Sequence, residues 1–301
     1  MTPPSVFIII LQYNNSEDTI KCLNSVKELH YPNFRTIVVD NASDKTEQDN
    51  IREYVKSQLQ DLKRVSLVFN SQNLGYAGGN NIGINYALSE GADYIFILNN
   101  DTTVEPDTLD KLVTAAEQDP QVGAVGPAII EPNKTVYHGK ISWLKPELRH
   151  STTKPKNNFL NFKEYLIGAG LLVKRGVLEK IEGLDEIFFL YFEDADFSMR
   201  AQLAGYKLQV VPEAVIHHGS SASTKKLGSP LLLRYHMRNA LIFNSLNAPW
   251  TIKPFLIFWA GYVLLKNLFK MFLLPSKEKS ADAIIDGVLD FYKNQFGKIN
   301  P

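Results

Sequence analysis

The run Val6-Phe7-Ile8-Ile9-Ile10-Leu11 ends abruptly in the polar stretch Gln12-Tyr13-Asn14-Asn15. A short, continuous apolar run is typical of a strand that is buried on both faces of a parallel sheet. No basic residue precedes the run, six residues are short for a secretory leader, and no small-residue cleavage site follows. We therefore interpret residues 6–11 as a buried first strand.

Four further apolar runs follow within the first 130 residues, and helical patterns lie between them. The runs are Thr36–Asp40, Val65–Phe69, Tyr94–Asn99 and Val122–Ile130. One helix is expected after Ser16-Glu17-Asp18, where acids occupy the first turn, and another is expected from Pro106. Strands that alternate with helices predict an α/β fold, with a mostly parallel sheet flanked by helices.

The pattern is less regular after residue 130. Residues 131–162 are polar and contain prolines, which predicts a long loop or a small irregular insertion. Regular structure is expected again at Tyr165–Val173 and at Ile187–Phe192. A helix is expected from about Asp194 to Leu203.

The character changes after Ser223 to helices rich in Leu, Phe and Tyr. We therefore expect an α/β domain at residues 1–225 and a helical region at residues 226–301. Within the second region, Lys253, Lys266 and Lys270 interrupt the apolar stretch 250–274, so a clean transmembrane span is not expected.

The composition excludes some classes of protein. Lys+Arg and Asp+Glu are both 32, and this zero net charge argues against a nucleic-acid-binding protein, which would show a basic excess. Cys22 is the only cysteine, so no intramolecular disulfide can form, which fits a reducing cytoplasm and equally any compartment that requires no disulfide. A chain of 301 residues can bury a large core.

Polar clusters follow the predicted strands. Because ligands bind beyond the carboxyl ends of parallel strands, these clusters should share one rim of the sheet. Each alone could be turn chemistry, since Asn, Asp and Gly are standard turn residues, but several on one rim favour a ligand site. The candidates are Gln12, Tyr13, Asn14, Asp40, Asn73, Gly75, Asn80, Asn100 and Asp101.

Two of these clusters have specific alternatives. Asp40 could accept a hydrogen bond from a base or ribose, or could equally cap the helix after Ala42-Ser43-Asp44. The stretch 73–81, Asn-Leu-Gly-Tyr-Ala-Gly-Gly-Asn-Asn, lets backbone approach a ligand at a helix start. It matches neither a dinucleotide-binding fingerprint nor a phosphate-binding P-loop.

Acids and histidines mark the reactive part of the predicted rim. Asp101 could hold Mg²⁺ or Mn²⁺ together with substrate phosphates, or could simply cap a turn. Glu193, Asp194 and Asp196 follow the aromatic run 188–192. The helix macrodipole explains acids at a helix start, but an apolar flank also tunes a carboxylate towards general-base catalysis.

A pair of histidines, His217 and His218, ends a later apolar segment in a chain with only six histidines. A lone histidine is more often structural, whereas two adjacent ones favour contact with a metal or a phosphate.

These elements occur in a recognisable order. They are Val-Val-Asp-Asn-Ala-Ser at 38–43, the stretch 73–81, Leu-Asn-Asn-Asp-Thr at 98–102, Gly168-Ala169-Gly170, Phe-Glu-Asp-Ala-Asp-Phe at 192–197 and His-His-Gly-Ser at 217–220. Together they resemble the family 2 inverting glycosyltransferases, and most of all their bacterial rhamnosyltransferase-type members. The likeness runs from about residue 6 to residue 245.

The resemblance implies a GT-A fold with one nucleotide-sugar site and a C-terminal helical extension. Asp194 matches the family's catalytic base, with Glu193 in support. Asp101 matches the last acid of the Asp-x-Asp motif, whose first position is Asn99 here, and would hold Mg²⁺ or Mn²⁺ with His217, or else with His218. The resemblance also assigns donor contacts to Asp40, Asn73, Gly75, Gly170 and Arg238.

The implied reaction is a single displacement that inverts the anomeric carbon. The implied donor is dTDP-rhamnose, with UDP-sugars as the main competitor, and the acceptor is a glycan or a lipid-linked sugar. Aromatic and basic residues at 250–274 suit a membrane interface at the cytoplasmic side, or else packing on the α/β domain or on a second subunit as a homodimer.

Two other classes of protein fit this sequence less well. A non-catalytic sugar-nucleotide-binding subunit should have lost its acids, and Asp101, Glu193 and Asp194 are present. A nucleotidyltransferase would need a glycine-rich, basic loop after the first strand, where this chain has Gln-Tyr-Asn-Asn-Ser at 12–16.

Overall fold

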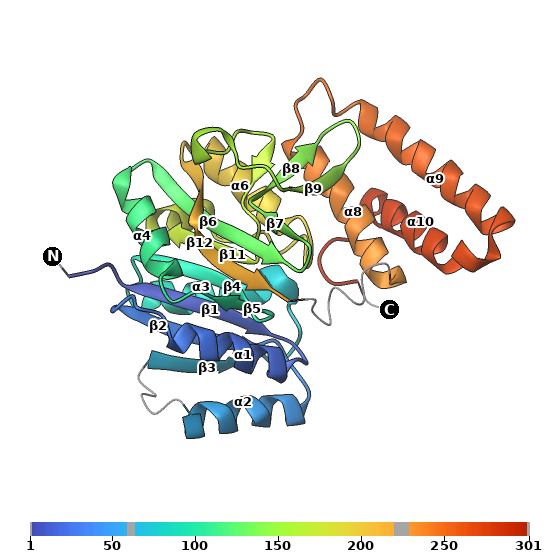
Figure 1. Cartoon of the computed structure of the whole chain (residues 1–301). Helices are drawn as coiled ribbons and strands as arrows, with labels where there is room; N and C mark the ends of the chain where they lie inside the picture. Colours follow the sequence, from blue (N-terminus) through green and yellow to red (C-terminus); the bar gives the residue numbers. More distant parts are fainter. Residues whose placement is uncertain (1, 59–63, 220–228, 300–301) are drawn as a thin grey trace.

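The computed structural model describes residues 2–58, 64–219 and 229–299, and its centre is a nine-stranded sheet (Figure 1). In sheet order the strands are β3 (Val65–Phe69), β2 (Phe34–Asp40), β1 (Val6–Gln12), β4 (Tyr94–Asn99), β11 (Gly170–Lys174), β6 (Val122–Glu131), β12 (Lys207–His218) and β5 (Thr102–Val104), with β7 (Lys134–Val136) paired to β6. The strands β3, β2, β1 and β4 are parallel, and β12 is parallel to β6. The predicted α/β fold is confirmed.

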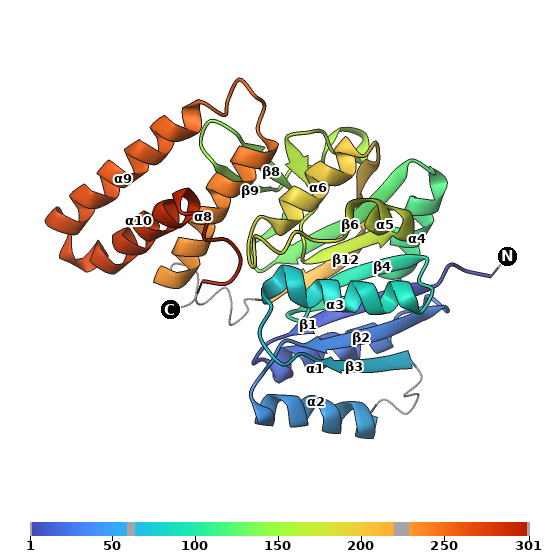
Figure 2. The same ribbon diagram turned by 180° about the vertical axis from the view of Figure 1, so that it is seen from behind.

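Helices cover both faces of this sheet (Figures 1 and 2). One face carries α1 (Ser16–Lys27), α2 (Lys45–Gln58) and α4 (Thr108–Gln118), and the other carries α3 (Gly75–Ser89), α5 (Arg175–Ile181) and α6 (Glu193–Leu203). Ile8 and Ile10 pack towards the first face, and Phe7 and Ile9 pack towards the second. Because both faces are covered, β1 needs a continuous apolar run rather than an alternating one.

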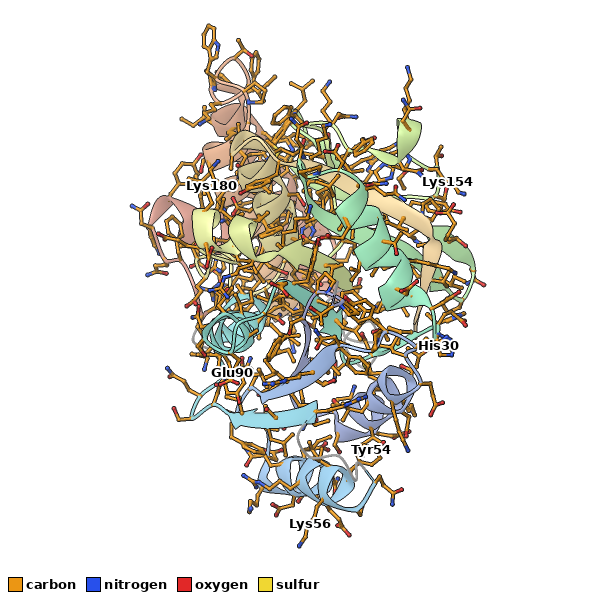
Figure 3. All side chains as sticks on the ribbon, turned by 90° about the vertical axis from the view of Figure 1, so that its left-hand side faces the viewer. His30, Tyr54, Lys56, Glu90, Lys154 and Lys180 are labelled. Atoms are coloured by element: carbon orange, nitrogen blue, oxygen red, sulfur yellow. The ribbon has the colours of Figure 1, made fainter. Side chains whose placement is uncertain are left out.

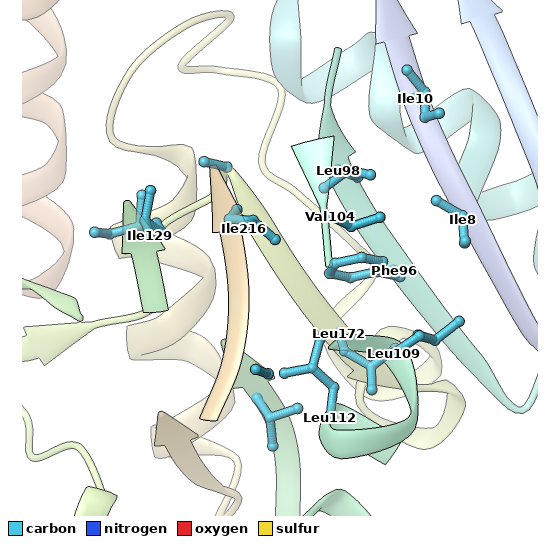
Figure 4. Packing of buried hydrophobic residues seen from close by; sticks show 14 of the residues in the cluster. Ile8, Ile10, Phe96, Leu98, Val104, Leu109, Leu112, Ile129, Leu172 and Ile216 are labelled. Carbon is cyan, nitrogen blue, oxygen red and sulfur yellow. The ribbon is translucent and has the colours of Figure 1, made fainter. Parts of the chain in front are cut away.

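The first of these cores is seen closely in Figure 4, where Leu109 and Leu112 of α4 lie against Leu172 of β11. Polar residues lie on the outside. Figure 3 shows the side chains of Lys56, Lys154 and Lys180 pointing outward from the periphery.

The expectation of a loop at 131–162 was wrong. This segment contains β7 together with β8 (His138–Ser142) and β9 (Glu147–Ser151), which form a second sheet with β10 (Glu164–Tyr165). The strands of this segment are short, and β9 is half exposed. None of them therefore contains the apolar run by which buried strands are recognised. Trp143, in the turn after β8, stacks on Phe243 with ring centroids 5.5 Å apart.

The regular structure expected at Ile187–Phe192 is also absent; the segment forms turns and bends. Phe189, Tyr191 and Phe192 have positive φ angles of 60°, 72° and 77°. Each such conformation costs a bulky residue about 1–2 kcal/mol. Tertiary hydrogen bonds therefore override the strand preference of the aromatic residues.

These hydrogen bonds come mainly from one side chain. Asn239 is fully buried, and its amide nitrogen lies 2.7 Å from the carbonyl oxygen of Phe188, 2.7 Å from that of Leu190 and 3.1 Å from that of Tyr191. We name residues 186–192 the aromatic loop. It leads directly into the first turn of α6.

Three C-terminal helices complete the chain: α8 (Pro230–Asn247), α9 (Phe255–Leu273) and α10 (Glu278–Tyr292). Ala240, Ile242 and Phe243 of α8 join the main core. Leu241 packs instead in a small cluster with α9 and α10. The helix α8 thus contacts both parts of the chain. The boundary expected near residue 225 lies outside the described residues, and the division at that point stays a prediction.

Within the described ranges, α9 is long and apolar enough to cross a membrane by length and composition. We had expected the lysines of this stretch to argue against that. Lys253 lies before α9, so the helix contains only Lys266 and Lys270.

We expect Asn239→Ala to lower the free energy of unfolding by about 2–4 kcal/mol, because buried carbonyl groups of the aromatic loop lose their donor. The matched control is Asn244→Ala, a buried asparagine of α8 whose amide bonds only the carbonyl oxygen of Ala240 in its own helix. We expect a cost of about 1 kcal/mol or less for the control. Urea unfolding of both variants checks this, and equal losses would contradict the role of Asn239.

Candidate active site

The carboxyl ends of the parallel strands meet at one rim, as their register requires. Gln12 at the end of β1 lies opposite Asp40 at the end of β2, and Leu11 lies opposite Asn99 at the end of β4. The strands β6 and β12 end on the same rim, because β11 runs antiparallel between β4 and β6. The polar clusters that follow β1, β2, β4 and β12 therefore share one edge of the sheet.

The β1 and β2 side of the rim is a tightly bonded polar network. Asp40 is buried, and its carboxylate accepts hydrogen bonds from the Gln12 amide at 3.0 Å, the Ser43 backbone N–H at 3.0 Å and the Gln48 amide at 3.0 Å. The carboxylate thus holds the turn before α2. This contact corresponds to the second of the two roles considered for Asp40, that of a helix cap. Gln12 Oε1 is buried and has no hydrogen-bond partner, so it retains acceptor capacity.

Of the neighbouring candidates, Asn14 and Asn100 are hydrogen-bonded within the protein, whereas Tyr13 is exposed. Asn14 accepts a hydrogen bond from the backbone N–H of Asp44, and the Asn100 amide donates to Thr19 Oγ1. Tyr13 is 51% exposed and presents an aromatic ring at the rim. An exposed ring at this edge can stack on a flat ligand.

The glycine-rich stretch packs against protein. Gly75 has φ +76°, and a Cβ atom there would lie 2.3 Å from the carbonyl oxygen of Phe189. That oxygen accepts a hydrogen bond of 2.6 Å from the backbone N–H of Tyr76. Asn73 Oδ1 accepts from the backbone N–H of Gly75, and Asn80 is buried inside α3. The first turn of α3 thus binds the aromatic loop.

Asp101 and the two histidines line a cavity of about 540 Å³ with Asp18 and Glu131. The Nε2 atom of His218 lies 3.3 Å from Asp101 Oδ1. That hydrogen bond raises the pKa of His218. His217, our first choice as metal ligand, instead places its Nε2 atom 2.6 Å from Glu105. Successive side chains of a strand point to opposite sides, so only one histidine can face Asp101.

Asp101 and His218 can therefore supply one carboxylate and one imidazole to a divalent cation. In the part of the chain that the structure describes, no group of three or more His, Cys, Asp or Glu side chains could hold a metal ion. Mg²⁺ commonly uses one or two carboxylates and takes its other ligands from substrate phosphates and water. The pair fits such a substrate-completed site.

Glu193 and Asp194 stand at the first turn of α6. The Glu193 carboxyl group is buried, and burial together with the neighbouring Asp194 raises its pKa to about 8. Asp194 is half-buried, and burial raises its pKa as well, although the backbone N–H groups of Gly168 and Ala195 oppose that shift. Asp194 Oδ2 accepts the Gly168 N–H at 3.0 Å. Burial thus favours the protonated form of Glu193, whereas the two backbone N–H groups favour the charged form of Asp194.

Tyr76 connects the two groups of acids, which the sequence did not reveal. Its hydroxyl oxygen lies 2.7 Å from the carbonyl oxygen of Gly168 and 2.9 Å from Asn99 Oδ1. Asn99 precedes the Asp101 turn, and Gly168 bonds Asp194. A tyrosine inside a glycine-rich stretch was the available signal.

Two other residues predicted to contact the donor lie among protein groups in this structure. Gly170 lies within the sheet, where a Cβ atom would meet Ile216 and Pro127, whereas Gly168 is the glycine beside Asp194. Arg238 is fully buried and donates to the carbonyl oxygens of Gln295 and Phe188. It therefore holds the aromatic loop and the C-terminal segment.

His150 of β9 was missed because the insertion was expected to be a loop. Its charge lowers the pKa of Asp194, against the larger effect of burial, and its Nδ1 atom lies 3.6 Å from Glu131. The second sheet thus brings a basic group towards the proposed catalytic acids.

Sequence comparison relates the chain to bacterial rhamnosyltransferases. It is 25% identical over 245 residues to a dTDP-rhamnosyl transferase RfbF of Shigella flexneri, covering 79% of each protein. It is 28% identical over 179 residues to an N-acetylglucosaminyl-diphospho-decaprenol L-rhamnosyltransferase of Mycobacterium tuberculosis, covering 54% of this chain and 58% of that protein.

Solved structures of low sequence identity share the fold. A mannosyltransferase of Pyrobaculum calidifontis, in complex with GDP-Man and Mn²⁺, superposes with a TM-score of 0.60 at 17% identity and covers 98% of this chain and 89% of that one. GalNAc-T7 with UDP, GalNAc and Mn²⁺ gives a TM-score of 0.64 at 15% identity, covering 97% of this chain and 56% of that one. The expected GT-A fold is thereby confirmed.

The family model for glycosyl transferase family 2 matches residues 7–182, more than half of the chain. The match includes β1, β2 and β4 and the polar residues that follow them, up to Asp101. This protein belongs to glycosyl transferase family 2 and is a glycosyltransferase of the rhamnosyltransferase-like kind.

Proposed function

We propose that this glycosyltransferase is metal-dependent and inverting, and that it moves rhamnose from dTDP-rhamnose to a hydroxyl group of a glycan or lipid-linked acceptor. Its setting would be bacterial cell-surface polysaccharide synthesis at the cytoplasmic side of the membrane. The observation that carries the proposal is the pairing of Asp101 with His218, together with a hydrogen-bonded path that runs from Asp194 through Gly168 and Tyr76 to Asn99, two residues before Asp101.

The donor is inferred from relatives. The Shigella relative is named for dTDP-rhamnose, and the mycobacterial relative is named for transfer to a diphospho-decaprenol acceptor. We assign the nucleotide to the β1 and β2 side of the rim, where Tyr13 is exposed and Gln12 retains an acceptor. UDP-sugars are the competing donors.

The metal is inferred from the chemistry of the cavity. Asp101 and His218 would hold Mg²⁺ or Mn²⁺, with donor phosphates as further ligands. A cation bound there supplies positive charge to the diphosphate as it leaves. To serve as a ligand, His218 must give up its proton, so metal binding should weaken at acidic pH.

The proposed chemistry is one displacement. Asp194 accepts the proton of the acceptor hydroxyl group as that oxygen attacks the anomeric carbon. The bond between this carbon and the diphosphate oxygen breaks on the opposite side, which inverts the anomeric configuration. The backbone N–H of Gly168 orients the Asp194 carboxylate, and the neutral Glu193 adds no second charge beside it.

The first test is release of nucleoside diphosphate from dTDP-rhamnose, UDP-sugars and GDP-mannose with Mn²⁺ and a lipid-linked acceptor. We expect turnover with one donor, and a loss of about 10²–10⁴-fold in Asp194→Asn, because the general base is removed. The control is Asp196→Asn. Asp196 lies two residues after Asp194 on α6, and the substitution removes its ion pair with Arg200.

This control should lower thermal stability while the rate per folded molecule stays within about threefold. Equal rates in the native chain and Asp194→Asn would refute Asp194 as the base. Release of pyrophosphate in place of a nucleoside diphosphate would refute the reaction class.

The two histidines give a second test. We expect His218→Ala to raise the Mn²⁺ concentration for half-maximal turnover by at least about tenfold, because it removes a ligand. His217→Ala should change that concentration by less than about twofold, since His217 pairs with Glu105. A larger effect for His217→Ala would return the ligand role to His217.

The raised pKa of Glu193 predicts a pH dependence of stability. The folded chain keeps a proton up to about pH 8 that the unfolded chain releases near pH 4.5. This stabilising contribution is complete below pH 4.5 and is lost as pH rises to about 8, by up to about 1.4 kcal/mol per pH unit.

Glu193→Gln has no such proton to lose. Between pH 5 and pH 8 the free energy of unfolding should therefore rise in this variant relative to the native chain, because only the native chain loses the contribution of the proton. Urea unfolding at several pH values measures the difference. Glu53→Gln on the exposed side of α2 controls for the loss of one carboxylate. A difference that stays constant with pH would contradict the buried, protonated state of Glu193.

A further inference from the structure

The outer face of α9 is a continuous apolar surface with no protein against it in the described chain. Phe258 is 73% exposed, Phe269 is 68% exposed and Phe272 is 84% exposed. At 100° per residue, these side chains and those of Ile257, Leu265 and Leu268 fall within about one third of the helix circumference. In both overall views α9 lies at the outer edge of the molecule (Figures 1 and 2).

The inner face of α9 is already satisfied. Leu256, Ala260, Val263 and Asn267 are buried, and their spacing of three and four residues places them on one stripe. Ala260 and Val263 pack with Leu241 of α8 and Val288 of α10. The outer face is therefore not needed to hold the C-terminal helices together.

The charges of α9 are of one sign. Its 19 residues include Lys266 and Lys270 and no acid. The two lysines are one turn apart, so both lie along the same edge of the exposed apolar face. A surface that combines apolar side chains with a basic edge complements a layer of anionic headgroups above hydrocarbon.

A transmembrane position does not fit the packing. The inner stripe of α9 rests on α8 and α10, where Arg234 forms ion pairs with Asp290 at 2.7 Å and with Asp286 at 3.3 Å. A spanning α9 would draw these charges into the hydrocarbon, which costs several kcal/mol. One apolar face and one protein-bound face instead suit a helix that lies in the plane of the interface.

A second copy of the chain is a poorer complement. Pairing two α9 helices would cover apolar surface, but each copy contributes lysines and neither contributes an acid from this helix. Anionic phospholipids supply the missing charge. We propose that α9 is an in-plane anchor that places its outer face in the interface of an anionic bilayer.

The anchor also affects the position of Asp194 relative to the membrane, and this consequence rests on the proposed function. The helix α8 packs on α9 and α10 and carries Asn239, whose amide holds the aromatic loop before Asp194. The height of the catalytic base above the bilayer is thereby set through packed helices. Such an arrangement suits a sugar acceptor whose lipid tail stays in the membrane.

The test is co-sedimentation of the full chain with vesicles of phosphatidylcholine alone, or with 30% phosphatidylglycerol. We expect binding to anionic vesicles, weakened by salt, and at least about tenfold lower partitioning for Phe258→Gln/Phe269→Gln/Phe272→Gln. Lys266→Gln/Lys270→Gln should lose most of the preference for anionic lipid.

The matched control, Leu144→Gln/Phe162→Gln/Leu203→Gln, changes three exposed apolar residues elsewhere and should bind like the native chain. No vesicle binding by the native chain, or equal binding by the α9 variant, overturns the proposal. A native dimer in sedimentation velocity that the α9 variant dissociates, without vesicle binding, assigns the face to a second copy. The vesicles contain no sugar nucleotide, so these outcomes are independent of the proposed reaction.

Discussion

Four consecutive carbonyl groups, those of Phe188 to Tyr191, accept hydrogen bonds from two helices that are far apart in the chain. The backbone N–H of Tyr76 at the start of α3 serves one of them, and the Asn239 amide of α8 serves the other three. Without these donors, three aromatic residues at positive φ would cost several kcal/mol with no compensation. The aromatic loop sets where α6 begins, and therefore where Glu193 and Asp194 stand.

The electrostatics of the site follow from that position. Two carboxyl groups side by side at a buried helix start repel each other when both are charged, which favours a proton on one of them. Glu193 is the deeper and has an oxygen without a hydrogen-bond partner, whereas Asp194 accepts the Gly168 N–H. Burial raises the pKa of both groups, and the hydrogen bonds to Asp194 oppose that shift, so the two neighbours favour different protonation states. The same division is a general means of separating a charged base from a neutral neighbour.

The sequence predicted the parts of the fold that local pattern determines. The continuous apolar runs of β1, β2 and β4 identified the sheet, and the polar residues after them identified its rim, because strand direction alone brings carboxyl ends together. The regular structure expected at 187–192 is absent because hydrogen bonds from the Asn239 side chain determine the backbone conformation of that segment. His218 could not be separated from His217 by sequence, since only the pleat of β12 and its pairing with β5 determine which one faces Asp101. The contact between Tyr76 and Gly168 joins residues 92 positions apart, so the glycine-containing stretches that hold them did not predict it.

The two halves of the site also differ in how they are built. The family match ends at residue 182, before Glu193, His218 and α8. The β1, β2 and β4 side depends on a sheet whose pattern is readable from short stretches. The Asp194 side depends on long-range contacts: α8 under the aromatic loop, and Trp143 of the second sheet stacked on Phe243. Surface elements such as β8, β9 and α9 can vary without disturbing the central sheet, because few core residues belong to them. The contacts of α8 with the aromatic loop are therefore the point at which changes in the C-terminal helices would move Asp194, the proposed base, relative to the central sheet.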